Sequence, residues 1–386
     1  MFPFPHSNPL KLDLSQFPSR ENLIYCNHAG TAPLTRAAAD MLRTFAGEAS
    51  GHASSVYDRW THRMEETRAA AARLVGGDKT EIAFTKSTTA GLNLVGMGLD
   101  WKPGDVVVVE EKTFPANWYA WKIAEKRGAT LWFWPERGGR YELADLEARL
   151  KQGGVRLVAA TSANFATGFR ADLEAIGNLC AAHGALHCVD AIQTLGVFPI
   201  DVRKCKIDFL SADSHKWLMG PEGAAIFYCA KEKLGLIDDA LVGWYGREAF
   251  WNYDQLGAPP DRTARRFEEG APNVCGVMAM GESLRILLDV GVERIGARNR
   301  ELCRILETEF AAQGWTVISP RDEKWASSIV SVCKDGVDPV KLAADLWKES
   351  KVWVVSRRGY LRISPHFYQS EEELRFLLDR VKRITG

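Results

Sequence analysis

The chain has 386 residues, of which 46% are hydrophobic, enough for one large domain and a smaller one. Its 49 lysine and arginine residues balance 49 aspartate and glutamate residues, which argues against nucleic-acid binding because that needs a strongly basic surface. No apolar run approaches the roughly 18 residues of a membrane span, so we expect no membrane association.

The first residues of the chain and its cysteines indicate the cell compartment in which we expect the protein. Residues 1–6 lack the basic segment and apolar stretch of a secretory signal. The eight cysteines are scattered without a C-x-x-C pair, which is typical of reduced thiols. We therefore expect a cytoplasmic enzyme that acts on a small molecule.

Between about residues 80 and 230, short apolar runs alternate with helical patterns. The runs are Ile82–Phe84, Val106–Val109, Leu131–Trp134, Leu157–Ala160, Leu186–Val189, Phe209–Leu210 and Ala225–Tyr228. One expected helix begins at Pro115 and ends in Lys126-Arg127 before Gly128, and another runs from Asp172 and stops at Gly184. This alternation indicates a largely parallel sheet covered on both faces, where ligands bind beyond the carboxyl ends of the strands.

After about residue 235 the pattern changes. Residues 244–266 predict an irregular connection, and residues 276–310 are rich in helical pattern. Strand-like stretches follow at 317–318, 328–332, 352–355 and 360–363. We expect a large domain at residues 21–255, and a small α+β domain built from residues 1–20 and 256–386.

Two charged residues at predicted strand ends carry the main chemical prediction. Lys216 follows the strand at 207–210, where desolvation would lower the pKa of its amine and make it nucleophilic; alternatively it is a solvated lysine. Asp190 ends another strand, where a buried carboxylate needs a cationic partner such as a protonated pyridine nitrogen, unless it only caps the next helix. Gln193 could donate to a phenolate oxygen or be a surface amide.

Three further segments fit the same pocket. Ser87, Thr88 and Thr89 open a helix whose N–H groups could hold a phosphate, or they simply cap that helix. Phe114 could stack on a planar ring or belong to the core. Arg362 points to the opposite face from its strand neighbours and could bind a carboxylate or form a surface salt bridge.

Two rival sites are not expected. Cys180, His183, His187 and Cys188 have zinc-like spacing, but they fall on different faces of their elements, so we predict no metal site. Gly96–Gly98 is a fragment of a dinucleotide fingerprint placed late in a helix, which argues against a nicotinamide oxidoreductase.

Taken together, these segments resemble the class V aminotransferases, a group of fold-type I enzymes that use pyridoxal 5'-phosphate (PLP). The group includes cysteine desulfurases, selenocysteine lyases, isopenicillin N epimerase and kynureninase. The similarity runs from Tyr25–Gly30 to Tyr360–Tyr368, and its most specific block is Val189–Gln193 followed by Ser214–Trp217. It implies an α/β fold in which a large PLP-binding domain, with a mostly parallel sheet covered by helices, is joined to a smaller α+β C-terminal domain.

The resemblance also implies roles for matching residues. Lys216 would hold PLP as a Schiff base and move the α-proton. Around the ring would lie Asp190 at the pyridinium nitrogen, Gln193 near the phenolic oxygen, Phe114 stacked on the ring and Asn164 beside it. Around the phosphate would lie Ser87, Thr88, Thr89, Asp213 and His215. The amino-acid substrate would meet Arg362 at its carboxylate and Asn27, His28 and Ala29 at the entrance.

The resemblance further implies a homodimer with active sites at the interface. The segment Glu269–Asn273 matches a loop that reaches the partner's phosphate, although Ala271 stands where many members have threonine. Desulfurases need a nucleophilic cysteine shortly before the carboxylate-binding arginine, and residues 354–360 contain none. Arg357 and Arg358 lie there instead, either as a cationic patch for a second acidic group on the substrate or as a solvated turn.

We therefore predict a PLP-dependent enzyme that acts at the α-carbon of an amino acid, with aminotransferase chemistry favoured. A β-lyase acting on a C–S or similar bond is the main alternative, and an epimerase is the third. A protein that kept this fold without catalysis would not be expected to retain Lys216, Asp190 and Arg362.

Overall fold

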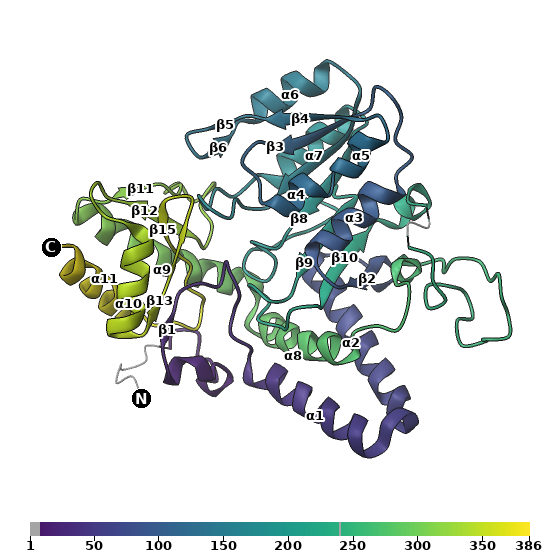
Figure 1. Cartoon of the computed structure of the whole chain (residues 1–386), viewed down its shortest axis with the longest axis horizontal. Coiled ribbons are helices and arrows are strands. Elements are labelled where there is room, and N and C mark those ends of the chain that lie inside the picture. The colour runs from purple at the N-terminus through teal and green to yellow at the C-terminus, as the bar shows by residue number, and fades with distance from the viewer. Residues whose placement is uncertain (1–7, 239–240) are drawn as a thin grey trace.

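The computed structural model describes residues 8–238 and 241–386, so residues 1–7, which begin the segment expected in the small domain, lie outside the description. A seven-stranded sheet forms the centre of the larger unit, in the order β2-β10-β9-β8-β7-β3-β4 (Figure 1). Only β10 runs antiparallel to its neighbours. The strands are β2 (Ile82–Thr85), β3 (Val106–Glu110), β4 (Thr130–Trp134), β7 (Val155–Thr161), β8 (Leu186–Asp190), β9 (Phe209–Asp213) and β10 (Ala225–Cys229).

These strands confirm the seven apolar runs and the mostly parallel sheet. Successive side chains of a strand face opposite sides, so Val107 and Val109 of β3 pack with one cluster while Val106 and Val108 pack with another. Helices α3 (Thr88–Gly98) and α5 (Lys122–Lys126) cover the first face. Helices α6 (Leu143–Lys151) and α7 (Leu173–Ala182) cover part of the second face.

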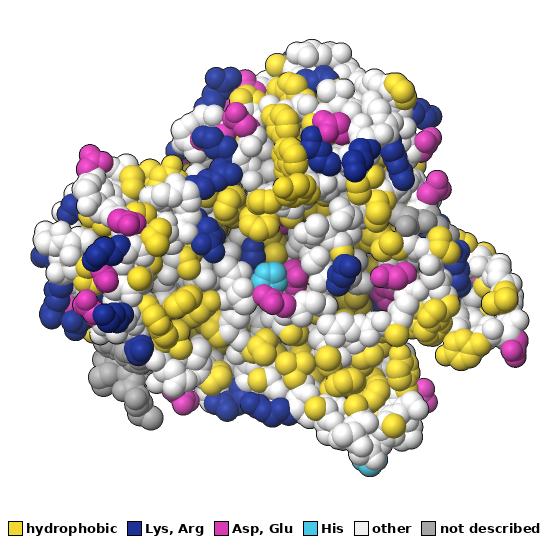
Figure 2. Space-filling view, viewed as in Figure 1, with side chains coloured by type: hydrophobic (Ala, Val, Ile, Leu, Met, Phe, Trp, Pro, Cys, Tyr) yellow, Lys and Arg dark blue, Asp and Glu magenta, His cyan; other side chains and the backbone are white. Residues whose placement is uncertain are grey.

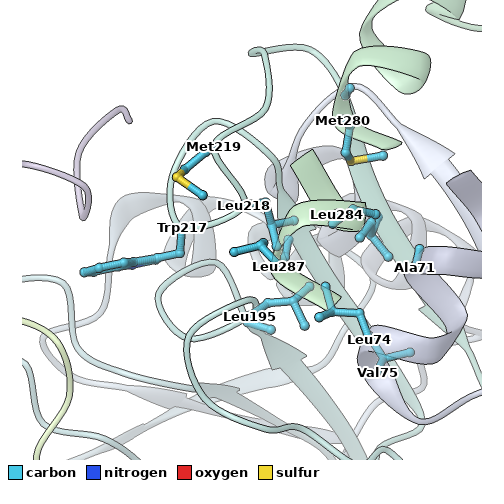
Figure 3. Packing of buried hydrophobic residues seen from close by; sticks show 14 of the residues in the cluster. Ala71, Leu74, Val75, Leu195, Trp217, Leu218, Met219, Met280, Leu284 and Leu287 are labelled. Atoms are coloured by element: carbon cyan, nitrogen blue, oxygen red, sulfur yellow. The ribbon is translucent and has the colours of Figure 1, made fainter. Parts of the chain in front are cut away.

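Three helices cover the rest of the second face: α1 (Arg36–His52), α2 (Tyr57–Val75) and α8 (Val274–Val290). Figure 3 shows Leu74 of α2 directed toward Leu195, with Leu284 and Leu287 of α8 above them. Each buried leucine of this kind contributes roughly 1.5–3 kcal/mol. The cluster also contains Trp217, Leu218 and Met219, so the turn that follows Lys216 is anchored in the core.

The connections differ in part from the predicted ones. The helix expected from Pro115 to Arg127 is divided into α4 (Pro115–Tyr119) and α5, because the chain turns at Ala120–Trp121 and buries the Trp121 indole completely. Helix α7 begins after its cap Asp172, as predicted. Residues 241–263 form irregular turns, which Figure 1 shows as a loop projecting at the right.

A four-stranded antiparallel sheet, in the order β11-β12-β15-β14, forms the smaller unit. Its strands are β11 (Thr316–Val317), β12 (Val330–Cys333), β14 (Val355–Arg357) and β15 (Tyr360–Ile363), and its helices are α9 (Val292–Ala312), α10 (Pro339–Ser350) and α11 (Glu371–Thr385). The short strands β1 (Ile24–Tyr25) and β13 (Val352–Trp353) pair in parallel beside it. A further hairpin joins β5 (Glu136–Arg137) to β6 (Arg140–Tyr141). The short 3-10 helices are Leu14–Gln16, Pro18–Glu21, Ala53–Val56, Lys79–Glu81, Lys231–Leu236 and Ala264–Phe267.

The first described residues contact both units. Phe17 stacks on Tyr368 with ring centroids 4.2 Å apart, and Arg20 forms a buried ion pair with Glu373. Helix α8 packs against α1 and α2 of the larger unit, whereas α9 packs against α11. The domain boundary at residues 255 and 256 stays a prediction. Within the described ranges, we find no helix of the length and apolar character needed to cross a bilayer.

Candidate active site

The carboxyl ends of β2, β8 and β9 meet at a pocket of about 320 Å³ between the two units, within the roughly 300–1,000 Å³ typical of small-molecule sites. It is lined by Ala29, Gly30, Thr31, Ser87, Thr88, Thr89, Phe114, Ala116, Phe165, Asp190, Ile192, Gln193, Asp213, His215, Lys216, Arg357 and Arg362. Figure 2 shows histidine and acidic side chains gathered at the centre of the face between the two units. The fold therefore brings most of the predicted site residues together in one cavity.

Lys216 lies in the turn that follows β9, and its side chain enters this pocket. Its ammonium nitrogen is 5.4 Å from the centroid of the Phe114 ring. Burial lowers the pKa of Lys216 to about 8, an effect that the nearby Asp190 carboxylate opposes. The loss of hydration therefore outweighs the attraction between the two charges, and a substantial fraction of the amine is neutral near physiological pH.

Asp190 ends β8 in the same pocket and is held by two donors. Its Oδ1 accepts a hydrogen bond from the Ile192 N–H at 3.0 Å, and its Oδ2 accepts one from Asn117 Nδ2 at 2.7 Å. Burial raises the pKa of Asp190, while these hydrogen bonds and the charge of Lys216 oppose the rise. Each donor favours the carboxylate form and fixes its direction toward the pocket.

The end of the pocket near α3 has the features expected of an anion site. Ser87 caps α3, its Oγ accepting from the Ala90 N–H at 3.1 Å, so the alternative of helix capping is realised. Thr88 Oγ1 accepts from the Asp213 N–H at 2.9 Å, and the Asp213 carboxylate lies 3.1 Å from His215 Nδ1. The positive end of α3 thus faces the cavity beside an imidazole.

Arg362 enters the pocket from β15 of the smaller unit. Its side chain is 1% exposed, and its Nη1 and Nη2 donate to the Phe165 carbonyl at 2.8 Å and to Asn27 Oδ1 at 2.9 Å. Its Nε has no hydrogen-bond partner among the described residues. Burial and the nearby Arg357 lower the pKa of Arg362 to about 9. The guanidinium therefore remains a cation at neutral pH, and its hydrogen-bond acceptors are a carbonyl and an amide oxygen rather than a carboxylate.

Several predicted residues occupy less direct positions. Gln193 lines the pocket, but its Nε2 donates to the Ala29 carbonyl at 3.1 Å. Asn164 lines a small adjoining cavity, where its Oδ1 accepts from the backbone of its own loop. His28 does not line the pocket, since it is fully buried and hydrogen-bonded to Ser364 and Tyr368.

Ala271 is exposed and lies outside the cavity of its own chain. Sequence reasoning missed Asn117, the buried donor to Asp190, which lies three residues after Phe114 at the start of α4. It also missed Phe165, whose ring meets that of Phe114 edge-on at 5.2 Å. Among the described residues, no cluster of three or more histidine, cysteine or acidic side chains could hold a metal ion.

A comparison with protein-family models matches residues 24–376 to the aminotransferase class-V model. The chain belongs to the aminotransferase class-V family. A probable cysteine desulfurase of Pyrococcus abyssi is 30% identical to this family member over 84% of each chain. Isopenicillin N epimerase of Streptomyces clavuligerus is 27% identical, over 83% of this chain and 84% of its own. The solved apo structure of a cysteine desulfurase from Thermococcus onnurineus superposes with a TM-score of 0.89 at 26% identity, covering 100% of this chain and 99% of the other.

Membership confirms the fold, the PLP cofactor and an enzymatic role toward amino acids. The pocket of this class-V chain also fits PLP by its own chemistry. It offers a partly neutral buried amine, a carboxylate for the ring nitrogen, an aromatic side chain beside the amine, and helix N–H groups at one end. The relatives differ in the reaction named for them, so the reaction of this chain must be argued from its own residues.

Proposed function

We propose that this class-V enzyme is an aminotransferase that takes the amino group from an amino acid, working as a cytoplasmic homodimer. One observation carries the choice of reaction: the pocket has a full set of groups for proton transfer at Cα but no thiol. None of the described lining residues is a cysteine. Sulfur extraction by a protein persulfide therefore lacks its nucleophile.

The segment before Arg362 supports the same conclusion. Arg357 pairs directly with Tyr360, so only Arg358 and Gly359 form the turn between β14 and β15. Both have positive φ, 52° and 81°, as expected of a tight hairpin. A desulfurase would need a cysteine-bearing loop in this region, and a two-residue turn has no length to supply one.

In the proposed mechanism, Arg362 binds the substrate carboxylate through its guanidinium. The Asn27 side chain and the Phe165 carbonyl hold this guanidinium in place. When bound, PLP supplies an electron-withdrawing ring that stabilises negative charge at the substrate Cα. Asp190 keeps the ring nitrogen protonated, and Asn117 keeps Asp190 ionised and oriented. Lys216 would hold the cofactor through its amine, and the same amine, once released by the incoming substrate amine, would take the proton from Cα.

The first experiment tests the cofactor anchor. Purified protein should absorb visible light as a PLP enzyme, and borohydride should abolish that absorbance by fixing the cofactor to the chain. Lys216→Ala should never form it, whereas the control Lys86→Ala should, because Lys86 is exposed and does not line the pocket. Borohydride labelling that persists in Lys216→Ala would assign the anchor to another residue.

The second experiment separates the possible reactions. Mixing the holoenzyme with a panel of amino acids should convert PLP to pyridoxamine phosphate and release the matching oxo acid. Ammonia and pyruvate without that conversion would show elimination, and racemised amino acid with neither product would show epimerisation. Either result would replace the aminotransferase assignment.

The carboxylate-binding role of Arg362 has its own test. Arg362→Leu should raise the amino-acid KM by roughly 10- to 150-fold, because a charge-assisted hydrogen bond contributes about 1.5–3 kcal/mol. PLP affinity should change far less. Equal losses of both affinities would show that Arg362 acts on the pocket as a whole.

The homodimer is supported by exposed apolar groups. Trp251, Tyr253 and Leu256 are 67%, 74% and 92% exposed in the projecting 241–263 segment, and exposed patches of this kind mark protein interfaces. Ala271 is exposed as well, as a contact to a partner's site requires. Sedimentation should give twice the mass of one chain, and Trp251→Asp should weaken that association; a monomeric active enzyme would refute it.

The proposed cytoplasmic location is supported by the cysteines. The eight free thiols are consistent with a reducing compartment.

A further inference from the structure

Two arginines reach the same pocket from one face of the small sheet. In the β14–β15 ladder, Arg357 lies opposite Tyr360, and Val355 lies opposite Arg362. Directly opposed residues share a face, and so do alternate residues along a strand. Arg357 and Arg362 are therefore diagonal neighbours on one face, with Cα atoms roughly 7–8 Å apart, and both line the pocket.

The two arginines differ in depth and in partners. Arg362 is buried and held by the Phe165 carbonyl and Asn27. Arg357 is exposed at the mouth, and its one recorded hydrogen bond is from Nη1 to its neighbour Ser356 at 2.8 Å. Within residues 8–238 and 241–386, the hydrogen-bond acceptors of both arginines are carbonyl or amide oxygens, and neither arginine forms an ion pair with an acidic side chain. One cation thus lies deep in the pocket and a second lies near its opening.

The acidic groups of the pocket are already committed elsewhere. Asp213 lies 3.1 Å from His215, and Asp190 is held by Asn117 beside Lys216. The charge of Arg357 nevertheless reaches the centre of the site, since it contributes to lowering the pKa values of both Arg362 and Lys216. The guanidinium groups of Arg357 and Arg362 therefore face the pocket with no protein carboxylate to neutralise them.

We propose that the substrate is an acidic amino acid, whose α-carboxylate binds Arg362 in the depth of the pocket and whose side-chain carboxylate binds Arg357 at the mouth. The proposal rests on the proposed function and adds the substrate class. Arg358 offers an internal control, because it follows Arg357 directly but does not line the pocket. Its guanidinium instead lies 5.1 Å from the Phe165 ring and donates to the Thr113 carbonyl.

The test compares substrates that differ only in charge. With the PLP-loaded enzyme, kcat/KM is measured for aspartate against asparagine and for glutamate against glutamine, following conversion of the cofactor by absorbance. We expect the better acid to exceed its amide by about 10- to 150-fold, the range for one charge-assisted hydrogen bond. Arg357→Gln should remove that advantage and leave the amides within about twofold, whereas Arg358→Gln should retain it.

A binding measurement makes the test independent of the reaction. Succinate should compete with substrate or perturb the cofactor absorbance more strongly than succinamate in the wild type, and equally in Arg357→Gln. The substrate assignment is overturned if the wild type prefers neither acid, or if Arg357→Gln weakens acids and amides alike. Amides that react as well as acids would sink this inference and leave the proposed function intact. A holoenzyme that converts no amino acid would overturn both.

Discussion

The buried amine of Lys216 should destabilise the enzyme when no cofactor is bound. Folding moves the Lys216 pKa from 10.5 to about 8, so the unfolded chain binds more protons than the folded one between these two values, and stability rises with pH across that window. The difference between these two pKa values corresponds to about 3 kcal/mol at pH values below the folded pKa. Replacing the lysine by methionine, of similar length, removes this cost.

We therefore expect apo Lys216→Met to be more stable than apo wild type by about 3 kcal/mol near pH 7, and by about 1 kcal/mol near pH 10. Urea unfolding of both apo proteins at the two pH values measures the difference. Packing differences between the two proteins are the same at both pH values, and other groups titrate alike in both proteins. The change with pH in the stability difference between Lys216→Met and wild type therefore reports on Lys216 alone.

The exposed residue Lys126 provides the matched control, since Lys126→Met should change stability by less than about 0.5 kcal/mol at either pH. A stability difference for Lys216→Met that stays constant between the two pH values would refute the reasoning. So would a wild type that is the more stable protein near pH 7, because attraction to Asp190 would then outweigh burial.

Three further changes test the supports of the site. Asn117→Leu removes the 2.7 Å hydrogen bond to Asp190, so PLP affinity in equilibrium dialysis should fall by up to about 150-fold, and the acid limb of the activity profile should move to higher pH because the pKa of Asp190 rises. Glu268→Leu removes the buried carboxylate that pairs with Arg68 and leaves that guanidinium only the more exposed Glu65, which should lower the free energy of unfolding by about 3–5 kcal/mol; an unchanged urea midpoint would contradict this. Phe114→Ala should weaken PLP binding by only about 2- to 12-fold, as expected for one aromatic contact, and a total loss would mean that the ring shapes the pocket.

The sequence predicted the larger unit well because its strands, apart from the edge strand β4, are buried on both faces. Continuous apolar runs such as Val106–Val109 are typical of strands that are buried on both faces. Glycine and capping residues such as Asp172 mark the ends of the helices between them. The interrupted helix at Ala120–Trp121 was not predictable, since its turn serves the burial of one indole against residues distant in sequence. Local pattern carries no information about such a contact.

The site divides in the same way. Lys216 and Asp190 were predicted to line a pocket because each is a charged residue at or just after the end of an apolar strand, and Arg362 because it alternates with apolar neighbours along its strand; all three do line the pocket. Asn117 was missed, since its importance lies in reaching an aspartate 73 positions further along the chain. His28 was placed at the entrance by similarity, yet its ring is enclosed and its pKa falls to about 4 through burial, a surrounding built from residues around position 366 that no local pattern reveals.

The pairing of β1 with β13 sets the order in which the enzyme can be completed during synthesis. Ile24 lies beside Val352, and Asn27, which holds Arg362, bridges to Ser364. These partners are separated by roughly 330 positions of chain. At about 5–20 residues per second, the N-terminal segment must therefore remain without its partners for about 15–65 s after it is made. Lys216 is made well before Arg362, which lies 146 positions later, so the two groups that line the pocket from opposite units can meet only when synthesis is nearly complete.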